Sequence, residues 1–264
     1  MILEDGVVLR QAPIKRLFQH FLSSFNTLGV VLLCLSLWQF GATFTSALIL
    51  PEPLSVLKKA LEILNTDSNT LLITSKRAFL AIILAFFVGS TLGIVAANFK
   101  SFAAFIKPFV DILQGIAPII WVVIALFWFG IGDVSVVFVV FVTLTPLCFG
   151  SSFMSVFNLN KNLSELCKAY KLSILKRLRV FYLPAMLPFL LSNLSLIFAM
   201  GIKIVVMAEL LGAVNGVGAR LNDARNFLDS EQIFAFVVLM VALIFLFESL
   251  IIKPLRIIFM PWQR

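Results

Sequence analysis

The sequence of 264 residues has little charge: Asp, Glu, Lys and Arg make up 13% of it, about half the share of a typical soluble domain. Hydrophobic residues make up 61%. A soluble core of this size cannot bury so much apolar surface, because much of a small domain stays in contact with water. The composition therefore excludes an ordinary cytosolic enzyme, a disordered protein and a disulfide-stabilised secreted domain. It indicates a polytopic membrane protein.

Residues that carry catalysis or bind metals are also scarce. His20 is the single histidine, and the three cysteines, Cys34, Cys148 and Cys167, fit no zinc or redox spacing. The G-x-x-x-x-G-K-[ST] loop that binds nucleotide phosphates does not occur. We therefore expect no catalytic residue, no metal site, no cofactor and no ATPase motif in this chain, which argues against an intramembrane enzyme.

Long runs without charge dominate the chain. A helix needs roughly 20 apolar residues to cross a bilayer, at about 1.5 Å of rise each. The first run follows basic residues, as in a signal peptide, but it is long and no small-residue cleavage site follows, so we read it as a retained helix. The runs predict an all-α polytopic membrane protein with six transmembrane helices, at about residues 28–49, 78–98, 109–129, 134–154, 189–212 and 233–253.

The basic residues are distributed unevenly between the loops. With both termini inside, the cytoplasmic segments hold 14 of the 21 Lys and Arg residues and the outer segments hold six. Since cytoplasmic loops carry the excess of Lys and Arg, this predicts a multi-pass membrane protein with both termini in the cytoplasm. Residues 1–27 are then a cytoplasmic segment, 28–258 the transmembrane domain and 259–264 a cytoplasmic tail. The basic residues that give the net charge of +8 then face anionic lipid and a cytoplasmic partner. The charge therefore gives no reason to expect nucleic acid.

Two segments outside the spans have a helical pattern. The first follows Pro51-Glu52-Pro53 and predicts a short amphipathic helix at the outer interface, with apolar Val56, Leu57, Ala60, Leu61 and Leu64. The second lies in the longest cytoplasmic loop, about 158–188, and has a stripe of Leu166, Ala169, Leu172, Leu175 and Leu178. Such a stripe fits a groove on a partner protein or the inner leaflet of the membrane, and the pattern alone favours neither.

The same loop resembles a known family. The string Glu165-Leu166-Cys167-Lys168-Ala169-Tyr170-Lys171-Leu172-Ser173, followed by Leu183-Pro184 and Pro188, is similar to the EAA loop of ABC importer permeases. That loop has the pattern E-A-A-x-x-x-G-A-S followed by L-P-x-x-x-P. Leu166 and Cys167 stand in place of its two alanines, and Lys171 stands in place of its glycine.

Other segments extend the resemblance over about residues 45–258 to the nitrate/sulfonate/taurine-type permeases. They are Leu50-Pro51-Glu52-Pro53, Gly89-Ser90-Thr91-Leu92-Gly93, Ile116-Ala117-Pro118, Trp128-Phe129-Gly130-Ile131-Gly132, Ala208-Glu209-Leu210-Leu211-Gly212-Ala213 and Gly216-Val217-Gly218. The resemblance implies the MetI-like type I importer fold and a permease subunit, usually in a homodimer. It also implies an extracytoplasmic binding protein and two ABC ATPase subunits that bind ATP and Mg.

By the same resemblance, one helix of the long loop is the coupling helix that docks on the ATPase. The residues that it assigns to this contact are Glu165, Leu166, Cys167, Ala169, Lys171, Leu172 and Ser173. The solutes carried by this branch include nitrate, sulfonates, taurine, bicarbonate and thiamine-precursor pyrimidines. An ion-coupled secondary transporter or a channel is the alternative, although the spans show no inverted repeat and almost no charge for ion coupling.

Two charged residues within the fifth span are candidates for the translocation pathway. Lys203 lies near the bilayer centre, where a lysine costs about 2.5–3.5 kcal/mol on insertion scales. It therefore contacts an anionic solute in a wet pathway, or it pairs across the bundle or a dimer interface. Glu209 is six residues further on and on another face of the helix. It lines the outer gate, or it pairs with Arg220 or Arg225.

Glycine and proline mark further features of the spans. Gly89 and Gly93 form a G-x-x-x-G pattern, which predicts close packing against another helix. Pro118 and Pro146 lie inside predicted spans, so we expect each to kink its helix.

Overall fold

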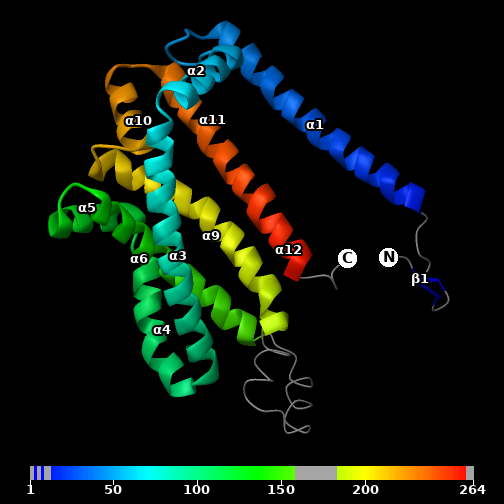
Figure 1. Ribbon diagram of the computed structural model, residues 1–264, viewed down its shortest axis with the longest axis vertical. Helices are drawn as coiled ribbons and strands as arrows, with labels where there is room; N and C mark the ends of the chain where they lie inside the picture. The colour runs from blue at the N-terminus through cyan, green and yellow to red at the C-terminus, as the bar shows by residue number, and fades with distance from the viewer. Residues whose placement is uncertain (1–2, 5–6, 9–12, 158–182, 260–264) are drawn as a thin grey trace.

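The computed structural model describes the backbone of residues 3–4, 7–8, 13–157 and 183–259, and the side chains of residues 29–157 and 186–256. Apart from two short antiparallel strands, β1 (Leu3–Glu4) and β2 (Val7–Val8), the elements of this part of the chain are helices. They are α1 (Pro13–Phe44), α2 (Pro53–Thr66), α3 (Ser68–Asn98), α4 (Lys100–Gly115), α5 (Pro118–Phe129), α6 (Asp133–Phe157), α9 (Leu183–Gly212), α10 (Val217–Asn226), α11 (Ser230–Phe247), the π-helix η2 (Glu248–Ile252) and α12 (Lys253–Phe259) (Figure 1). The all-α polytopic class is confirmed.

Most of the predicted spans have a counterpart in the described part of the chain. In the described part of the chain, four stretches are long and apolar enough to cross a membrane: 68–98, 133–157, 186–212 and 230–256. The pair α4 and α5 makes a fifth if the two helices form one broken span. α1 itself has 32 residues, Pro13–Phe44, and its apolar stretch within the described side chains is Gly29–Phe44.

The prediction of one continuous helix over 109–129 is wrong. α4 and α5 are bent by 95° relative to each other. Ile116 and Ala117 between them are extended, with ψ angles of 125° and 139°. Pro118 takes the first turn of α5, where its missing N–H leaves no hydrogen bond unmade, and a proline disfavours helix at the residue before it. Pro118 therefore starts a helix instead of kinking one, whereas Pro146 lies inside α6 as predicted.

α3 and α6 run side by side through the middle of the bundle (Figure 1). A Cβ atom added at Gly89 would lie 2.5 Å from the Thr145 carbonyl oxygen, and one added at Gly93 would lie 2.5 Å from that of Phe149. Both glycines thus let the two backbones approach closely, and the packing predicted from the G-x-x-x-G pattern is confirmed. α9 packs against α6 and α3 and completes the core.

The predicted amphipathic helix is α2, which lies at one end of the bundle near α10 (Figure 1). It buries Val56, Ala60 and Ile63 and packs against α11. The other apolar residues of the predicted stripe, Leu57, Leu61 and Leu64, are exposed in the isolated chain. We call this end of the molecule the α10 end. α6 finishes and α9 begins at the opposite end (Figure 1).

Candidate functional site

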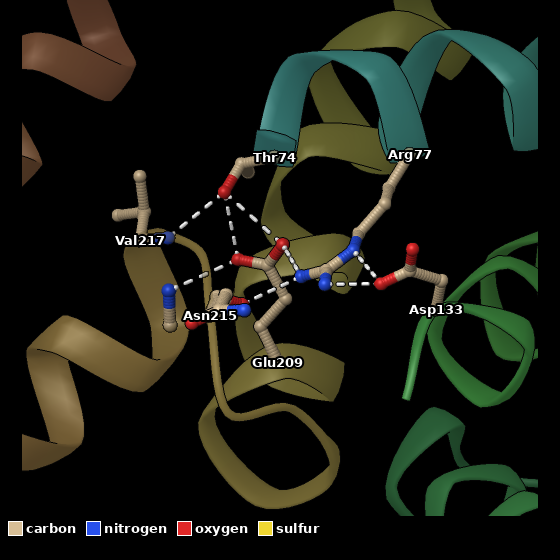
Figure 2. Close-up of polar contacts among 7 residues, drawn as sticks. Thr74, Arg77, Asp133, Glu209, Asn215 and Val217 are labelled. Atoms are coloured by element: carbon tan, nitrogen blue, oxygen red, sulfur yellow. Dashed lines mark hydrogen bonds and ion pairs between the residues drawn. The ribbon is translucent and has the colours of Figure 1, made fainter. Parts of the chain in front are cut away.

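A charge cluster joins three helices towards the α10 end, and Figure 2 shows its contacts. Arg77 on α3 donates from Nη1 to Glu209 Oε1 on α9 at 2.7 Å and from Nε to Asp133 Oδ1 on α6 at 2.9 Å. Its Nη2 also donates to Asp133 Oδ1. Arg77 is 7% exposed and Glu209 is fully buried. We call Thr74, Arg77, Asp133 and Glu209 the Arg77 cluster.

The chain between α9 and α10 closes around the Glu209 carboxylate. Gly218 N donates to Glu209 Oε2 at 3.0 Å, and Thr74 Oγ1 donates to the same oxygen at 2.8 Å. Val217 N in turn donates to Thr74 Oγ1 at 2.8 Å. A buried carboxylate with one cation and two further donors is well compensated, so this end of α9 is fixed to α3 and to the start of α10.

Glycine is required at the turn of this loop. Gly216 has a φ of +109°, a conformation that residues with a side chain rarely adopt. A Cβ atom there would lie 2.4 Å from Glu209 Oε1. The neighbouring Asn215 carbonyl accepts a hydrogen bond from Arg77 Nη1 at 2.6 Å. The strings that carry the sequence resemblance, around Glu209 and Gly216-Val217-Gly218, thus lie next to each other in the fold.

The predicted pairing of Glu209 with Arg220 or Arg225 is wrong. Arg220 Nε lies 3.2 Å from Asp67 Oδ2, and Arg225 Nη2 donates to Asn222 Oδ1 at 2.9 Å. Both side chains therefore have other partners at the surface, while Glu209 is buried and pairs with Arg77.

Sequence reasoning missed Thr74, Arg77 and Asp133. The notable signal was that Arg77 and Asp133 each border a charge-free run, Arg77 before residues 78–99 and Asp133 before residues 134–160. Charges in those positions look like the ends of spans. Arg77, which counts as a residue of an outer loop in the basic-residue balance, lies inside α3.

Lys203 lines a pocket of about 310 Å³ at the bend between α4 and α5. Gln114, Ile116, Pro118, Thr143 and Met200 also line it. Lys203 is exposed in the isolated chain, and among the described residues no carboxylate forms an ion pair with it. It lies nine residues before the end of α9 at Gly212, hence about 14 Å along the helix from the α10 end.

The remaining candidate residues, Glu165, Leu166, Cys167, Ala169, Lys171, Leu172 and Ser173, lie outside the described part of the chain. Among the residues that are described, no group of three His, Cys, Asp or Glu side chains could hold a metal ion.

An apolar helical bundle with a lysine-lined pocket at the bend between two helices and a buried charge cluster fits the membrane subunit of a transporter. Residues 89–257 match the family described as "Binding-protein-dependent transport system inner membrane component", and the chain belongs to that family. It is a multi-pass inner-membrane permease subunit of an ABC importer and is not itself an ATPase. Its family works with a binding protein and with a partner ATPase that binds ATP.

Three curated relatives share 24% identity with the chain. The taurine transport system permease protein TauC of Escherichia coli (strain K12) aligns over 246 residues, which is 90% of this chain and 89% of the relative. The putative aliphatic sulfonates transport permease protein SsuC of Bacillus subtilis (strain 168) aligns over 209 residues, 78% of this chain and 76% of the relative. The nitrate import permease protein NrtB of Synechococcus elongatus aligns over 157 residues, 59% of this chain and 56% of the relative.

A solved structure shares the fold. An inward-facing form of the MetNI methionine ABC transporter superposes with a TM-score of 0.63 at 17% identity, over 71% of this chain and 95% of that chain. The MetI-like fold expected from the resemblance is therefore confirmed.

Proposed function

We propose that this permease conducts a small anionic or polar solute, of the sulfonate, nitrate or bicarbonate class, past Lys203. The observation that supports the proposal is that Lys203, nine residues from the end of the apolar helix α9, lines a pocket with no carboxylate paired to it in the described residues. A lysine at this depth is costly unless an anion or water offsets its charge. The solutes named for the relatives, including taurine, sulfonates, nitrate and bicarbonate, each carry an anionic group.

The other polar groups of the pocket suit such a solute. Gln114 and Thr143 line the pocket beside Lys203. The Gln114 carboxamide can donate to an oxygen of the solute, whereas the Thr143 hydroxyl already donates to the Val139 carbonyl at 2.7 Å and can only accept, for example from the ammonium of taurine or the hydroxyl of bicarbonate. One ammonium and a carboxamide can bind two oxygens of a sulfonate, nitrate or carbonate group by charge-assisted and neutral hydrogen bonds. The remaining walls are apolar, so they strengthen these contacts by excluding water.

Solute uptake into proteoliposomes that contain the permease, its ATPase and its binding protein tests the role of Lys203. We expect Lys203→Met to lower uptake roughly ten- to hundredfold, the range set by losing one hydrogen bond to a charged group, and Lys203→Arg to retain more of it. Lys76→Met is the matched control, because Lys76 is exposed on α3 and lines a different pocket. Uptake by Lys203→Met at the wild-type rate would refute the proposal. A complex that no longer assembles would instead assign Lys203 to the interface.

The proposal also includes the subunits of the complete transporter. The proposed complex contains a second copy of this chain, two ATPase subunits with bound Mg-ATP and one extracytoplasmic binding protein. Coupling to the ATPase is assigned to Glu165, Leu166, Cys167, Ala169, Lys171, Leu172 and Ser173. The described helices support this, because α6 ends at Phe157 and α9 begins at Leu183 at the end opposite α10 (Figure 1). The proposed orientation puts the α10 end outside and segments 1–27, 158–188 and 259–264 in the cytoplasm.

A further inference from the structure

The two ion pairs of Arg77 differ in their exposure to solvent. Glu209 is fully buried and also accepts hydrogen bonds from Thr74 and Gly218. The Asp133 side chain is 75% exposed, and Arg77 is the one cation paired with it in the described part of the chain. Water competes for Asp133 and not for Glu209, so the pair with Asp133 can open while the pair with Glu209 stays closed.

Asp133 stands directly after a glycine corner that joins α5 to α6. Gly130 has φ +73° and ψ −170°, and Gly132 has φ +155°. The backbone conformation of Gly130 is open almost exclusively to glycine. At its other end α5 meets α4 at the 95° bend before Pro118. This 12-residue helix therefore runs between two corners, and it packs against α6 and α9.

α5 borders the Lys203 pocket, because Pro118 in its first turn and Ile116 just before it line that pocket. We propose that Asp133 is a positioning residue of the transport cycle. Its ion pair with Arg77 holds the α5–α6 corner against α3 and keeps the pocket closed from the α10 side, and it breaks when that side opens. This role does not depend on the chemistry of the solute.

The strength of the pair suits a contact that is made and broken in every cycle. An ion pair that is largely exposed shifts a two-state equilibrium by at most about fivefold. A pair as buried as Arg77–Glu209 would shift it more than a hundredfold by the usual cost of breaking such a pair. The cluster thus combines a permanent contact with a reversible one on a single guanidinium group.

The labelling rate of a cysteine in the pocket tests the proposal. The complete transporter, with Met200→Cys as its single permease cysteine and Cys34, Cys148 and Cys167 replaced by serine, is reconstituted in proteoliposomes. Met200 is 39% exposed and lines the pocket. A membrane-impermeant maleimide is added from the α10 side. We expect Asp133→Ala to raise the labelling rate by up to about fivefold and Asp133→Glu to return it towards the wild-type value.

Asp223→Ala is the matched control, because Asp223 is exposed on α10 and has no ion pair among the described residues. We expect it to label at the rate of the parent. An unchanged labelling rate in Asp133→Ala would overturn the proposal. So would a fall in its thermal unfolding midpoint as large as that of Arg77→Met, since Asp133 would then be a structural residue. Neither measurement involves the solute, so a failure of this proposal can be told apart from a failure of the proposed role of Lys203.

Discussion

Arg77 Nη1 and Glu209 Oε1 lie 2.7 Å apart and join α3 to α9 where neither side chain has appreciable contact with water. The two residues are separated by 132 positions in the sequence. Burying both charges is favourable only because each is fully satisfied: the carboxylate by Thr74 and Gly218, and the guanidinium by Asp133 and the Asn215 carbonyl. Such a pair specifies one arrangement of helices, since any other leaves a charge uncompensated.

Arg77→Met should lower the free energy of unfolding by about 3–5 kcal/mol, because it leaves the Glu209 charge buried without a cation. Adding Glu209→Gln to this variant should recover part of the loss, since it removes that charge. Chemical unfolding of the purified permease in detergent measures both. Arg220→Met is the control: its ion pair with Asp67 is half-exposed, so it should cost less than about 1 kcal/mol. Equal costs for the two single variants would contradict this account of the cluster.

Gly93→Ala should destabilise the contact between α3 and α6 by about 1–3 kcal/mol, the usual cost of overpacking a close contact. The new Cβ would lie 2.5 Å from the Phe149 carbonyl oxygen, and backbone there cannot move without separating the helices. Gly150→Ala on α6 is the matched control, since a Cβ there meets nothing within 4 Å, and alanine favours a helix over glycine by up to about 1 kcal/mol. The unfolding midpoints should therefore move in opposite directions. A stabilising Gly93→Ala would show that this contact tolerates a wider spacing.

The sequence predicts the class, the family and most span positions because these depend on composition and on local strings. A charge-free run such as 134–154 is apolar wherever its neighbours lie, and α6 contains all of it. The bend at Ile116-Ala117-Pro118 was not predictable in the same way. Hydropathy measures how apolar a segment is and carries no information on its direction, and a proline can begin a helix as well as kink one.

The Arg77 cluster shows a second limit. A charge at the edge of an apolar run normally marks the membrane surface, and Arg77 and Asp133 were assigned to loops on that basis. The burial of Arg77 and its pairing with Asp133 and Glu209 depend on partners 56 and 132 positions away, which only the packing of three helices brings together. The sequence identifies Lys203 as a candidate because it interrupts an apolar run. It gives no sign of the bend between α4 and α5 at which the Lys203 pocket lies.

The orientation of the bundle gives a further prediction. Cysteines placed singly at Ser164 and Asn222, in a chain without the native cysteines, should react with impermeant maleimide from opposite sides of the membrane, the first from the cytoplasm. Asn222 lies on α10, and Ser164 belongs to the segment between α6 and α9. We expect labelling from opposite sides because the segments assigned to the cytoplasm hold the excess of basic residues. Labelling of intact cells and of inverted vesicles measures the two rates, and reaction of both positions from one side would rule out this topology.

Coupling to the ATPase gives the last prediction, which rests on the apolar stripe of the long loop. If the segment around Leu172 docks in a groove of the ATPase, a few buried positions should contribute most of the contact free energy. Leu172→Asp would place an unpaired charge in that contact and should weaken it by about 3–5 kcal/mol, the cost of an uncompensated buried charge. The spans should still insert, because position 172 lies outside the six predicted spans.

Co-purification of the ATPase with the tagged permease, followed by uptake in proteoliposomes, measures the effect. Lys161→Asp introduces the same side chain in the same loop, before the apolar stripe, and should retain both the ATPase and uptake. Loss of both with Leu172→Asp alone would assign the contact to the stripe, as the EAA-like string from Glu165 to Ser173 implies. If Leu172→Asp keeps the ATPase bound and transports normally, the coupling element must lie elsewhere in the permease.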